Sequence, residues 1–169
     1  MENSTIKYDF LFVDFDGTLI ETITGKTFPE GVWDLRLRFD VLDAIKKYCP
    51  KKVYIVTNQG GIRLGYVDQD NFISKIEYVT ACVSEYCGVE TDYMFCSSNV
   101  ESDSDRKPNT GMLNYFSDRD KLYWEDCMMI GDASGKAGQF SDSDKKTAEN
   151  FGIEYEDVDD FIESVKSLE

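Results

Sequence analysis

The stretch Phe10-Leu11-Phe12-Val13-Asp14-Phe15-Asp16-Gly17-Thr18-Leu19 joins an apolar run to two aspartates and a glycine turn. The apolar run is typical of a buried strand, and side chains two residues apart on a strand point to the same face. The strand is therefore expected to end by presenting Asp14 and Asp16 together. Two like charges held this close are unfavourable unless they share a cation or a proton. The stretch thus indicates a functional site at the end of a strand.

The composition is that of a folded protein. Its 169 residues are 41% hydrophobic, enough for the core of one domain over residues 1–169. No segment approaches the about 20 apolar residues that cross a bilayer, and Met1–Lys7 lacks the apolar stretch of a signal peptide. We therefore expect no membrane partner, and a location in the cytoplasm, or in the nucleus of a eukaryotic cell.

The charged and reactive residues exclude several classes of function. The net charge is −15, which opposes long-range attraction to nucleic acid. The chain contains no histidine, which excludes Ser-His-Asp triads and histidine-ligated zinc. The five cysteines form no Cys-x-x-Cys pair and are expected to be free, buried thiols. Any chemistry must therefore use carboxylates, lysine, hydroxyls or a hard metal ion.

Apolar runs alternate with helical patterns along the chain. Strands are expected over Tyr8–Val13, Lys52–Val56, Tyr93–Cys96, Asp126–Ile130 and Ile153–Tyr155. Helices are expected over Val41–Cys49, Asp68–Cys87, Thr110–Phe116, Asp144–Phe151 and Val158–Leu168. This order predicts an α/β fold with a central parallel sheet of about five strands and helices on both faces. In such sheets, ligands bind beyond the carboxyl ends of the strands.

Polar residues follow several of these strands. Thr57-Asn58 follows the second strand, shortly before two glycines, a pattern that suits phosphoryl oxygens but equally an ordinary strand-to-helix turn. Lys107, fixed beside a proline in a loop, can neutralise a phosphoryl group, although a lone loop lysine is more often only a surface charge. Asp132 adds a carboxylate after the fourth strand. Carboxylates and waters are what Mg²⁺ prefers, so the set together predicts a magnesium site that binds a phosphomonoester.

These residues form four motifs that resemble those of the haloacid dehalogenase (HAD) superfamily. The motifs are Asp14-Phe15-Asp16-Gly17-Thr18, Thr57-Asn58, Lys107-Pro108 and Gly131-Asp132. The resemblance implies a three-layer, Rossmann-like fold with phosphatase chemistry.

A closer resemblance, to the phosphatase domain of the polynucleotide kinase/phosphatase family, covers nearly the whole chain. It rests on Gly25-Lys26-Thr27-Phe28-Pro29, Trp33-Asp34, Thr57-Asn58-Gln59, Arg106-Lys107-Pro108, Thr110-Gly111-Met112, Gly131-Asp132-Ala133-Ser134-Gly135-Lys136, Phe140-Ser141, Asp144 and Ala148, Asn150 and Gly152. It implies a Mg²⁺-dependent enzyme of DNA repair that removes the 3′-phosphate from DNA strand ends. No Walker-type phosphate loop is present, so we expect no 5′-kinase domain in this chain. We also expect the protein to be a monomer.

The resemblance also implies roles for individual residues. Asp14 is the nucleophile that forms an aspartyl-phosphate, and Asp16 is the general acid and base. Asp14, the backbone carbonyl of Asp16, and Asp132 hold Mg²⁺. Thr57 and Asn58 bind phosphoryl oxygens, and Lys107 stabilises their charge. For a further residue, Asp144, two interpretations stay open, an indirect role at the metal and a helix cap.

The short stretch Leu19–Trp33 predicts a small flap and no large cap domain, so an open site could admit a polymer end. Six basic residues near the expected mouth offer a rim for strand phosphates, against the alternative of scattered solubilising charges: Lys26, Arg36, Arg38, Arg63, Arg106 and Lys136. Phe28 and Trp33 are candidates for stacking on a base, with core packing an equal alternative for Trp33.

Two alternative functions stay open. One is a small-molecule phosphatase of the same superfamily, acting on a sugar phosphate or histidinol phosphate. Those relatives often carry a Cys/His zinc loop, which a chain without histidine cannot form. The other is a non-catalytic scaffold, which the four intact motifs oppose.

Overall fold

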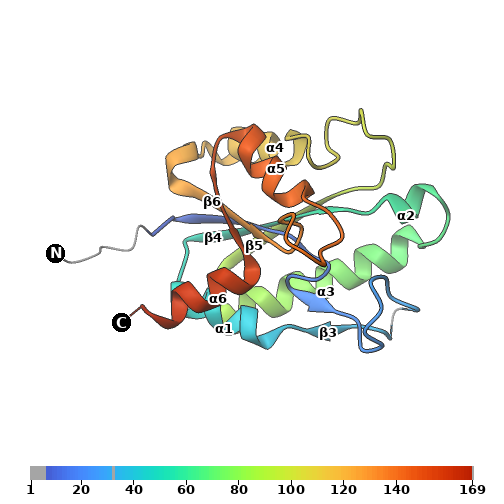
Figure 1. Cartoon of the computed structure of the whole chain (residues 1–169), viewed down its shortest axis with the longest axis horizontal. Coiled ribbons are helices and arrows are strands. Elements are labelled where there is room, and N and C mark those ends of the chain that lie inside the picture. Colours follow the sequence, from blue (N-terminus) through green and yellow to red (C-terminus); the bar gives the residue numbers. More distant parts are fainter. Residues whose placement is uncertain (1–6, 32, 169) are drawn as a thin grey trace.

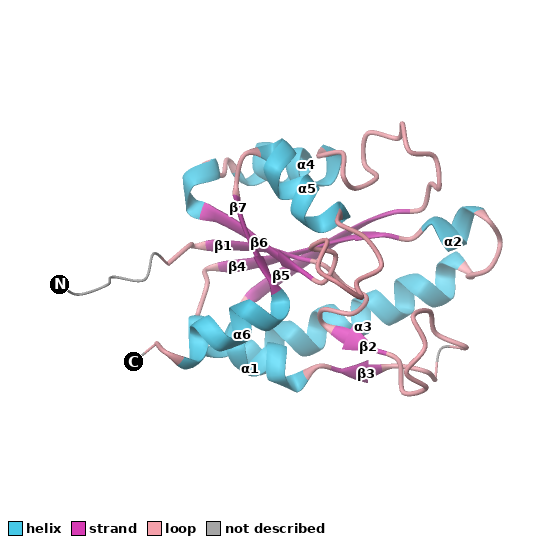
Figure 2. Cartoon of the chain, in the orientation of Figure 1, coloured by secondary structure: helices cyan, strands magenta, loops and turns pink. Residues whose placement is uncertain are grey.

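A central sheet of parallel strands organises the computed structural model, which describes residues 7–31 and 33–168 (Figures 1 and 2). The sheet order is β5-β4-β1-β6-β7. Its strands are β1 (Phe10–Val13), β4 (Lys52–Asn58), β5 (Glu90–Cys96), β6 (Cys127–Gly131) and β7 (Glu154–Asp157). The predicted five-stranded parallel sheet is confirmed. The expectation about a signal peptide falls largely on residues 1–6, outside the described residues.

Strand β1 lies at the centre because its side chains are apolar on both faces. Phe10 pairs with Lys52 of β4 on one side and with Cys127 of β6 on the other. Leu11 and Val13 belong to one hydrophobic core and Phe12 to the other. A continuous apolar run is what a strand covered on both faces requires. The run that opens the motif therefore fixes the middle of the sheet.

Helices cover both faces of the sheet, which gives three layers (Figure 1). One face carries α1 (Phe39–Tyr48), α3 (Gln69–Cys87) and α6 (Val158–Lys166). The other carries α4 (Gly111–Asp120) and α5 (Ser143–Phe151). Within the described part of the chain, no helix is long and apolar enough to span a membrane.

Some boundaries differ from the sequence-based expectation. Strand β5 begins at Glu90 rather than Tyr93, because its first half is polar and half exposed at the sheet edge. The short helix α2 (Gly60–Arg63) and the 3-10 helix η1 (Trp124–Asp126) have no apolar period to reveal them. All five cysteines are free as expected, but Cys49 is exposed and Cys82 half-buried, so burial of every thiol was wrong.

The predicted flap is a hairpin of two short antiparallel strands, β2 (Ile20–Glu21) and β3 (Arg36–Leu37). It extends past the predicted end at Trp33. The buried carboxylate of Asp34 holds its loop together, accepting hydrogen bonds from Thr24 N at 2.9 Å, Thr24 Oγ1 at 2.7 Å and Glu30 N at 3.0 Å. A buried acid satisfied in this way constrains a loop that has few apolar contacts of its own.

Candidate active site

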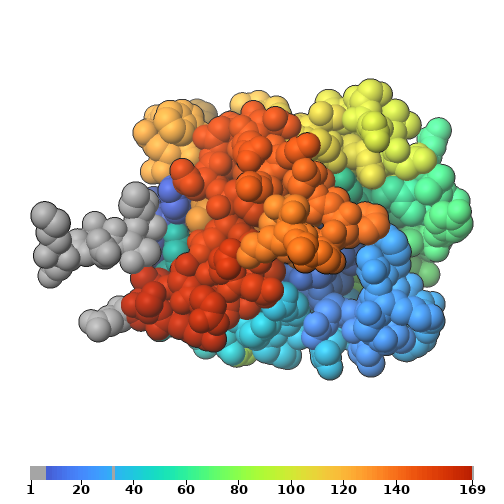
Figure 3. Space-filling model, viewed as in Figure 1, coloured from blue at the N-terminus to red at the C-terminus, as the bar shows by residue number. Residues whose placement is uncertain are grey.

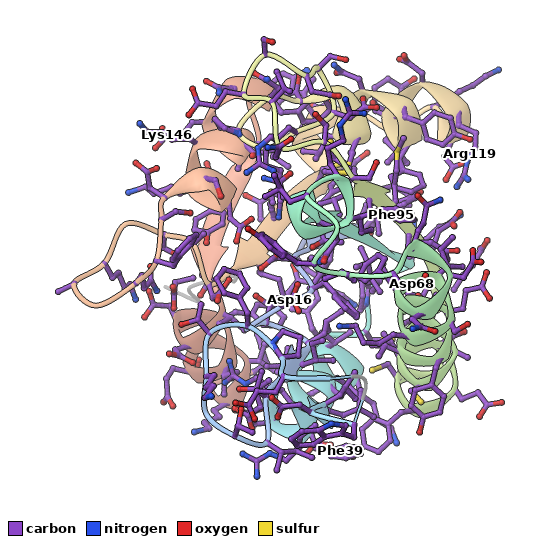
Figure 4. All side chains as sticks on the ribbon, turned by 90° about the vertical axis from the view of Figure 1, so that its right-hand side faces the viewer. Asp16, Phe39, Asp68, Phe95, Arg119 and Lys146 are labelled. Carbon is purple, nitrogen blue, oxygen red and sulfur yellow. The ribbon has the colours of Figure 1, made fainter. Side chains whose placement is uncertain are left out.

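The predicted site residues lie together at the carboxyl edge of the sheet. This edge is on the right of Figure 1, and Figure 4 looks onto it, with Asp16 near the middle. Asp14 follows β1, and its backbone N–H donates to Ile130 O of β6 at 3.1 Å. Parallel strands end at one edge, which is why motifs far apart in the sequence meet here.

Lys107 is the centre of the site's ion pairs. Its buried Nζ donates to Asp14 Oδ1 at 2.9 Å, to Asp144 Oδ1 at 2.6 Å and to Val56 O at 3.0 Å. All three ammonium hydrogens therefore have acceptors. The position of Lys107 in the loop before α4 thus puts its charge against the predicted nucleophile.

Three carboxylates form a cluster around this lysine. Oxygens of Asp14, Asp132 and Asp144 all lie within 4.8 Å of one another. Asp144 is not the N-cap of α5, a position that Asp142 occupies, so the helix-cap interpretation was wrong. Its other oxygen instead accepts from Ala133 N at 3.1 Å, which ties α5 to the loop that carries Asp132.

Two glycines leave room for these carboxylates. Gly17 has a φ of +78°, and a Cβ there would collide with the carboxylate of Asp132. A Cβ on Gly131 would collide with the carboxylate of Asp144. Gly17 and Gly131 are therefore required because a side chain at either position would displace a carboxylate of the site, and Gly17 also allows the turn after Asp16.

The crowding of acids perturbs their protonation. Burial raises the pKa of Asp132 to about 9, with a further contribution from the negative charge of Asp14. Burial and Asp14 likewise raise the pKa of Asp144 to about 6, against the opposing effect of Lys107. Burial alone would raise the pKa of Asp14, but Lys107 and hydrogen bonds hold it below its usual value. Asp14 is thus the acid of the cluster that most readily ionises.

The pKa of Lys107 moves with its partners. Burial alone would lower this pKa, but the carboxylates of Asp14 and Asp144 raise it above the ordinary value. The lysine therefore stays charged inside the site. In the described part of the chain, Lys107 is the one cation paired with this cluster of three acids, so the cluster is short of positive charge.

The side chain of Asp16 lies outside the three-carboxylate cluster. Its Oδ2 accepts a hydrogen bond from Gln59 Nε2 at 2.7 Å, and the same nitrogen donates to Thr57 Oγ1 at 3.0 Å. Burial raises the pKa of Asp16, although Lys75 and Gln59 oppose the shift. A metal contact through the Asp16 backbone stays a prediction. No role for Gln59 was predicted, because its contacts depend on which side chains its amide meets in the folded protein.

The side chain of Asn58 is largely engaged with the lysine loop. Its Nδ2 donates to Lys107 O at 3.0 Å, and its Oδ1 accepts from Lys107 N at 2.8 Å. This pair of bonds positions the backbone of Lys107. The predicted contact of Asn58 with phosphoryl oxygens remains a prediction that depends on its second amide hydrogen.

Most of the expected basic rim is already paired with acids. Lys26 pairs with Glu30, Arg36 with Glu21, Arg38 with Asp40 and Asp159, and Lys136 with Asp157 and Asp160. Arg106 instead donates to Ser98 O at 3.0 Å, and Arg63 makes no ion pair within residues 7–31 and 33–168. Positive charge for a strand phosphate is therefore most available near α2.

Exposed aromatic residues lie on the flap and opposite it. Phe28 and Phe140 are 68% and 82% exposed and pack edge to face with ring centroids 5.8 Å apart. The flap, in blue, and the loop before α5, in orange, are neighbours in Figure 3. Trp33 is 61% exposed, so core packing of Trp33 was wrong.

The fold and the four clustered motifs define a phosphatase of the HAD superfamily. Residues 9–162 match the model of the family described as polynucleotide kinase 3 phosphatase, and the chain belongs to that family.

Curated relatives of the chain include proteins of different description. An uncharacterized 20.8 kDa protein of Autographa californica nuclear polyhedrosis virus is 30% identical over 89% of this chain and 83% of its own length. A probable D-glycero-D-manno-heptose-1,7-bisphosphate 7-phosphatase of Thermoplasma volcanium is 27% identical over 78% of this chain and 90% of its own. The bifunctional polynucleotide phosphatase/kinase of Schizosaccharomyces pombe is 29% identical over 90% of this chain but only 37% of its own.

Solved structures share the fold. A HAD-like phosphatase from Mesorhizobium loti superposes with a TM-score of 0.68 at 22% identity, over 96% of this chain and 88% of the other. A D,D-heptose 1,7-bisphosphate phosphatase from B. bronchiseptica, complexed with magnesium and phosphate, has a TM-score of 0.66 at 19% identity, over 95% of this chain and 98% of the other. At these identities the likeness concerns the fold alone.

Proposed function

We propose that this protein is a Mg²⁺-dependent polynucleotide 3′-phosphatase that acts on DNA strand ends. The observation that carries the proposal is the match of residues 9–162 to the 3′-phosphatase family, which includes the flap as well as the motifs. The relative from Schizosaccharomyces pombe supports it over 90% of the chain.

The donor set fits a magnesium ion. Asp14, Asp132 and Asp144 offer hard oxygen ligands within 4.8 Å of one another, and among residues 7–31 and 33–168 only Lys107 forms ion pairs with this cluster. Asp14, Asp132 and the backbone carbonyl of Asp16 would hold the ion, with Asp144 behind them. When bound, Mg²⁺ orients the phosphate and offsets its charge.

The first step transfers the phosphoryl group to Asp14. An oxygen of Asp14 attacks phosphorus, and the bond from phosphorus to the sugar 3′-oxygen breaks. Asp16 gives its proton to that oxygen, and burial, which raises the pKa of Asp16, favours the protonated form that this step requires. Lys107 stays close to Asp14 and stabilises the charge on the phosphoryl oxygens.

The second step hydrolyses the aspartyl-phosphate. Asp16 takes a proton from water, whose oxygen attacks phosphorus as the bond to Asp14 breaks and inorganic phosphate leaves. Thr57 and Asn58, at the end of β4, bind phosphoryl oxygens in both steps. Asp14 and Asp16 return to their starting protonation states.

The small size of the flap and the exposed aromatic pair Phe28 and Phe140 support a strand end as substrate, because aromatic rings stack on bases. The alternative is a small phosphorylated metabolite. The heptose bisphosphatase of Thermoplasma volcanium, 27% identical over 78% of this chain, favours that alternative.

Phosphate release with Mg²⁺ from matched substrates tests the proposal. The substrates are a 3′-phosphorylated oligonucleotide, its 5′-phosphorylated isomer, a heptose bisphosphate and histidinol phosphate, and Asp14→Asn is the inactive reference. Release from the 3′-phosphorylated strand, with kcat/KM well above that on the metabolites, is expected. Release from metabolites alone would overturn the DNA-end proposal, and release from none would favour the scaffold.

A further inference from the structure

The amide of Gln59 joins two residues of the proposed mechanism. Its Nε2 donates to Asp16 Oδ2 at 2.7 Å and to Thr57 Oγ1 at 3.0 Å, so both amide hydrogens have acceptors. When Asp16 is ionised its carboxylate only accepts hydrogen bonds, so in that state the nitrogen of the amide faces Asp16. We propose that Gln59 is the positioning residue that orients Asp16 as proton donor to the leaving oxygen.

The backbone of Gln59 is held firmly enough to serve this purpose. Its N–H donates to Cys96 O of β5 at 2.7 Å, and its carbonyl accepts from Ile62 N at 3.1 Å. The residue is half-buried at the start of α2. A side chain that extends from a fixed backbone loses little further entropy when it orients a neighbour.

The contact determines which oxygen of Asp16 carries the proton. The Gln59 N–H points at Oδ2, and a proton on that oxygen would face another hydrogen. Among the described residues, no side chain or backbone group donates to Oδ1. The transferable proton therefore lies on Oδ1, the oxygen left free for the substrate.

The second contact orients the hydroxyl of Thr57. Because Gln59 occupies a lone pair of Oγ1, the hydroxyl hydrogen must point elsewhere, and its contact with Asn58 O is long at 3.4 Å. That hydrogen is available to a phosphoryl oxygen. The amide of Gln59 thus orients two groups: the Thr57 hydroxyl, which can donate a hydrogen bond to a phosphoryl oxygen, and the general acid Asp16.

The test compares substrates with different leaving groups, because only a poor leaving group requires protonation by Asp16. This part rests on the proposed function, in which Asp16 protonates the 3′-oxygen. An alkyl 3′-oxygen leaves slowly without a proton, whereas the nitrophenolate of p-nitrophenyl phosphate leaves readily. Gln59→Met removes both hydrogen bonds with little change of volume, and Gln59→Ala is a second variant. The exposed Gln69 supplies a matched control, Gln69→Ala.

Gln59→Met is expected to lower kcat/KM on a 3′-phosphorylated oligonucleotide about 10–100-fold, a part of the usual value of general acid catalysis. Its kcat/KM on p-nitrophenyl phosphate, which reports the first step alone, should change less than about threefold, since nitrophenolate leaves with little protonation. In an Asp16→Asn background, Gln59→Met should lower kcat/KM on the oligonucleotide by less than about threefold further, the part that its contact with Thr57 contributes. Gln69→Ala should match the wild type on both substrates.

Equal losses of kcat/KM on both substrates, or none on the oligonucleotide, would overturn the role of Gln59 in positioning Asp16. If the wild-type protein releases no phosphate from the oligonucleotide but hydrolyses a sugar phosphate, only the DNA-end proposal fails. The sugar phosphate, also an alkyl ester, then replaces the oligonucleotide in the comparison. A wild type inactive on every phosphomonoester would overturn both proposals.

Discussion

The site and the flap both contain ion pairs, but in opposite surroundings. The side chains of Lys107 and Asp144 are 3% and 1% exposed, whereas those of Arg36 and Glu21 on the flap are 62% and 43% exposed. An exposed pair contributes at most about 1 kcal/mol, while burying an ion costs several kcal/mol before its partner compensates. The flap pair is thus a minor surface feature. Because burial of these charges opposes folding, the cluster is better explained by a role in the reaction than by a contribution to the free energy of unfolding.

The largest expected effect comes from removing the buried nucleophile. Asp14→Asn should lower phosphate release at least about a thousandfold, because an amide cannot form the acyl-phosphate. The circular dichroism spectrum should stay that of a folded protein. Asp118→Asn, on the exposed face of α4, is the control and should retain full turnover. Substantial turnover by Asp14→Asn would remove Asp14 as nucleophile.

Removing the buried cation should affect stability as well as turnover. Lys107→Met leaves Asp14 and Asp144 without their shared partner, and such a loss costs about 3–5 kcal/mol. Urea unfolding at neutral pH measures the free energy of unfolding. The control is Lys146→Met, since Lys146 forms a half-exposed surface pair with Asp142. A cost below about 1 kcal/mol would mean that this pair behaves like the surface pairs of the flap.

Magnesium binding should depend on pH because the acids of the site hold a proton. The pKa of Asp132 is raised to about 9, so near pH 7 this carboxyl is protonated and the ion must displace the proton. The apparent affinity for Mg²⁺ should rise up to about tenfold per pH unit below this pKa and level off above it. Calorimetry in buffers of different ionisation enthalpy counts the protons released. Binding at pH 7 without proton release would contradict the shift.

The smallest effects are expected in the flap. Asp34→Ala removes the hydrogen bonds to Thr24 and Glu30. It should lower the thermal midpoint by a few degrees and should affect KM, by raising it, more than it affects kcat. Arg36→Ala, in the same hairpin, removes only a surface pair and should change the free energy of unfolding by no more than about 0.5 kcal/mol. Thermal unfolding and steady-state kinetics of the two variants compare them directly. Equal effects would mean that Asp34 does not fix the flap.

The framework of the site could be predicted because it depends on strand ends. The apolar run before Asp14 predicts a central strand, and parallel topology then brings Lys107 and Asp132 to the same edge. Asp144 could not be settled, because a residue in the first turn of a helix has the same sequence signal whether it caps the helix or turns inward. Gln59 was missed because its function depends on which side chain its amide meets.

The sequence by itself determined the α/β architecture and the acidic, phosphate-binding character of this protein, since strand periodicity and chain order dictate which motifs follow which strands. Only the tertiary structure decided which charges are shared. It placed Lys107 between Asp14 and Asp144, turned Asp16 toward Gln59, and paired most of the expected basic rim with acids. The physical reason is that hydrogen bonds and ion pairs depend on distances of a few ångströms between residues far apart in the chain, which local patterns do not encode.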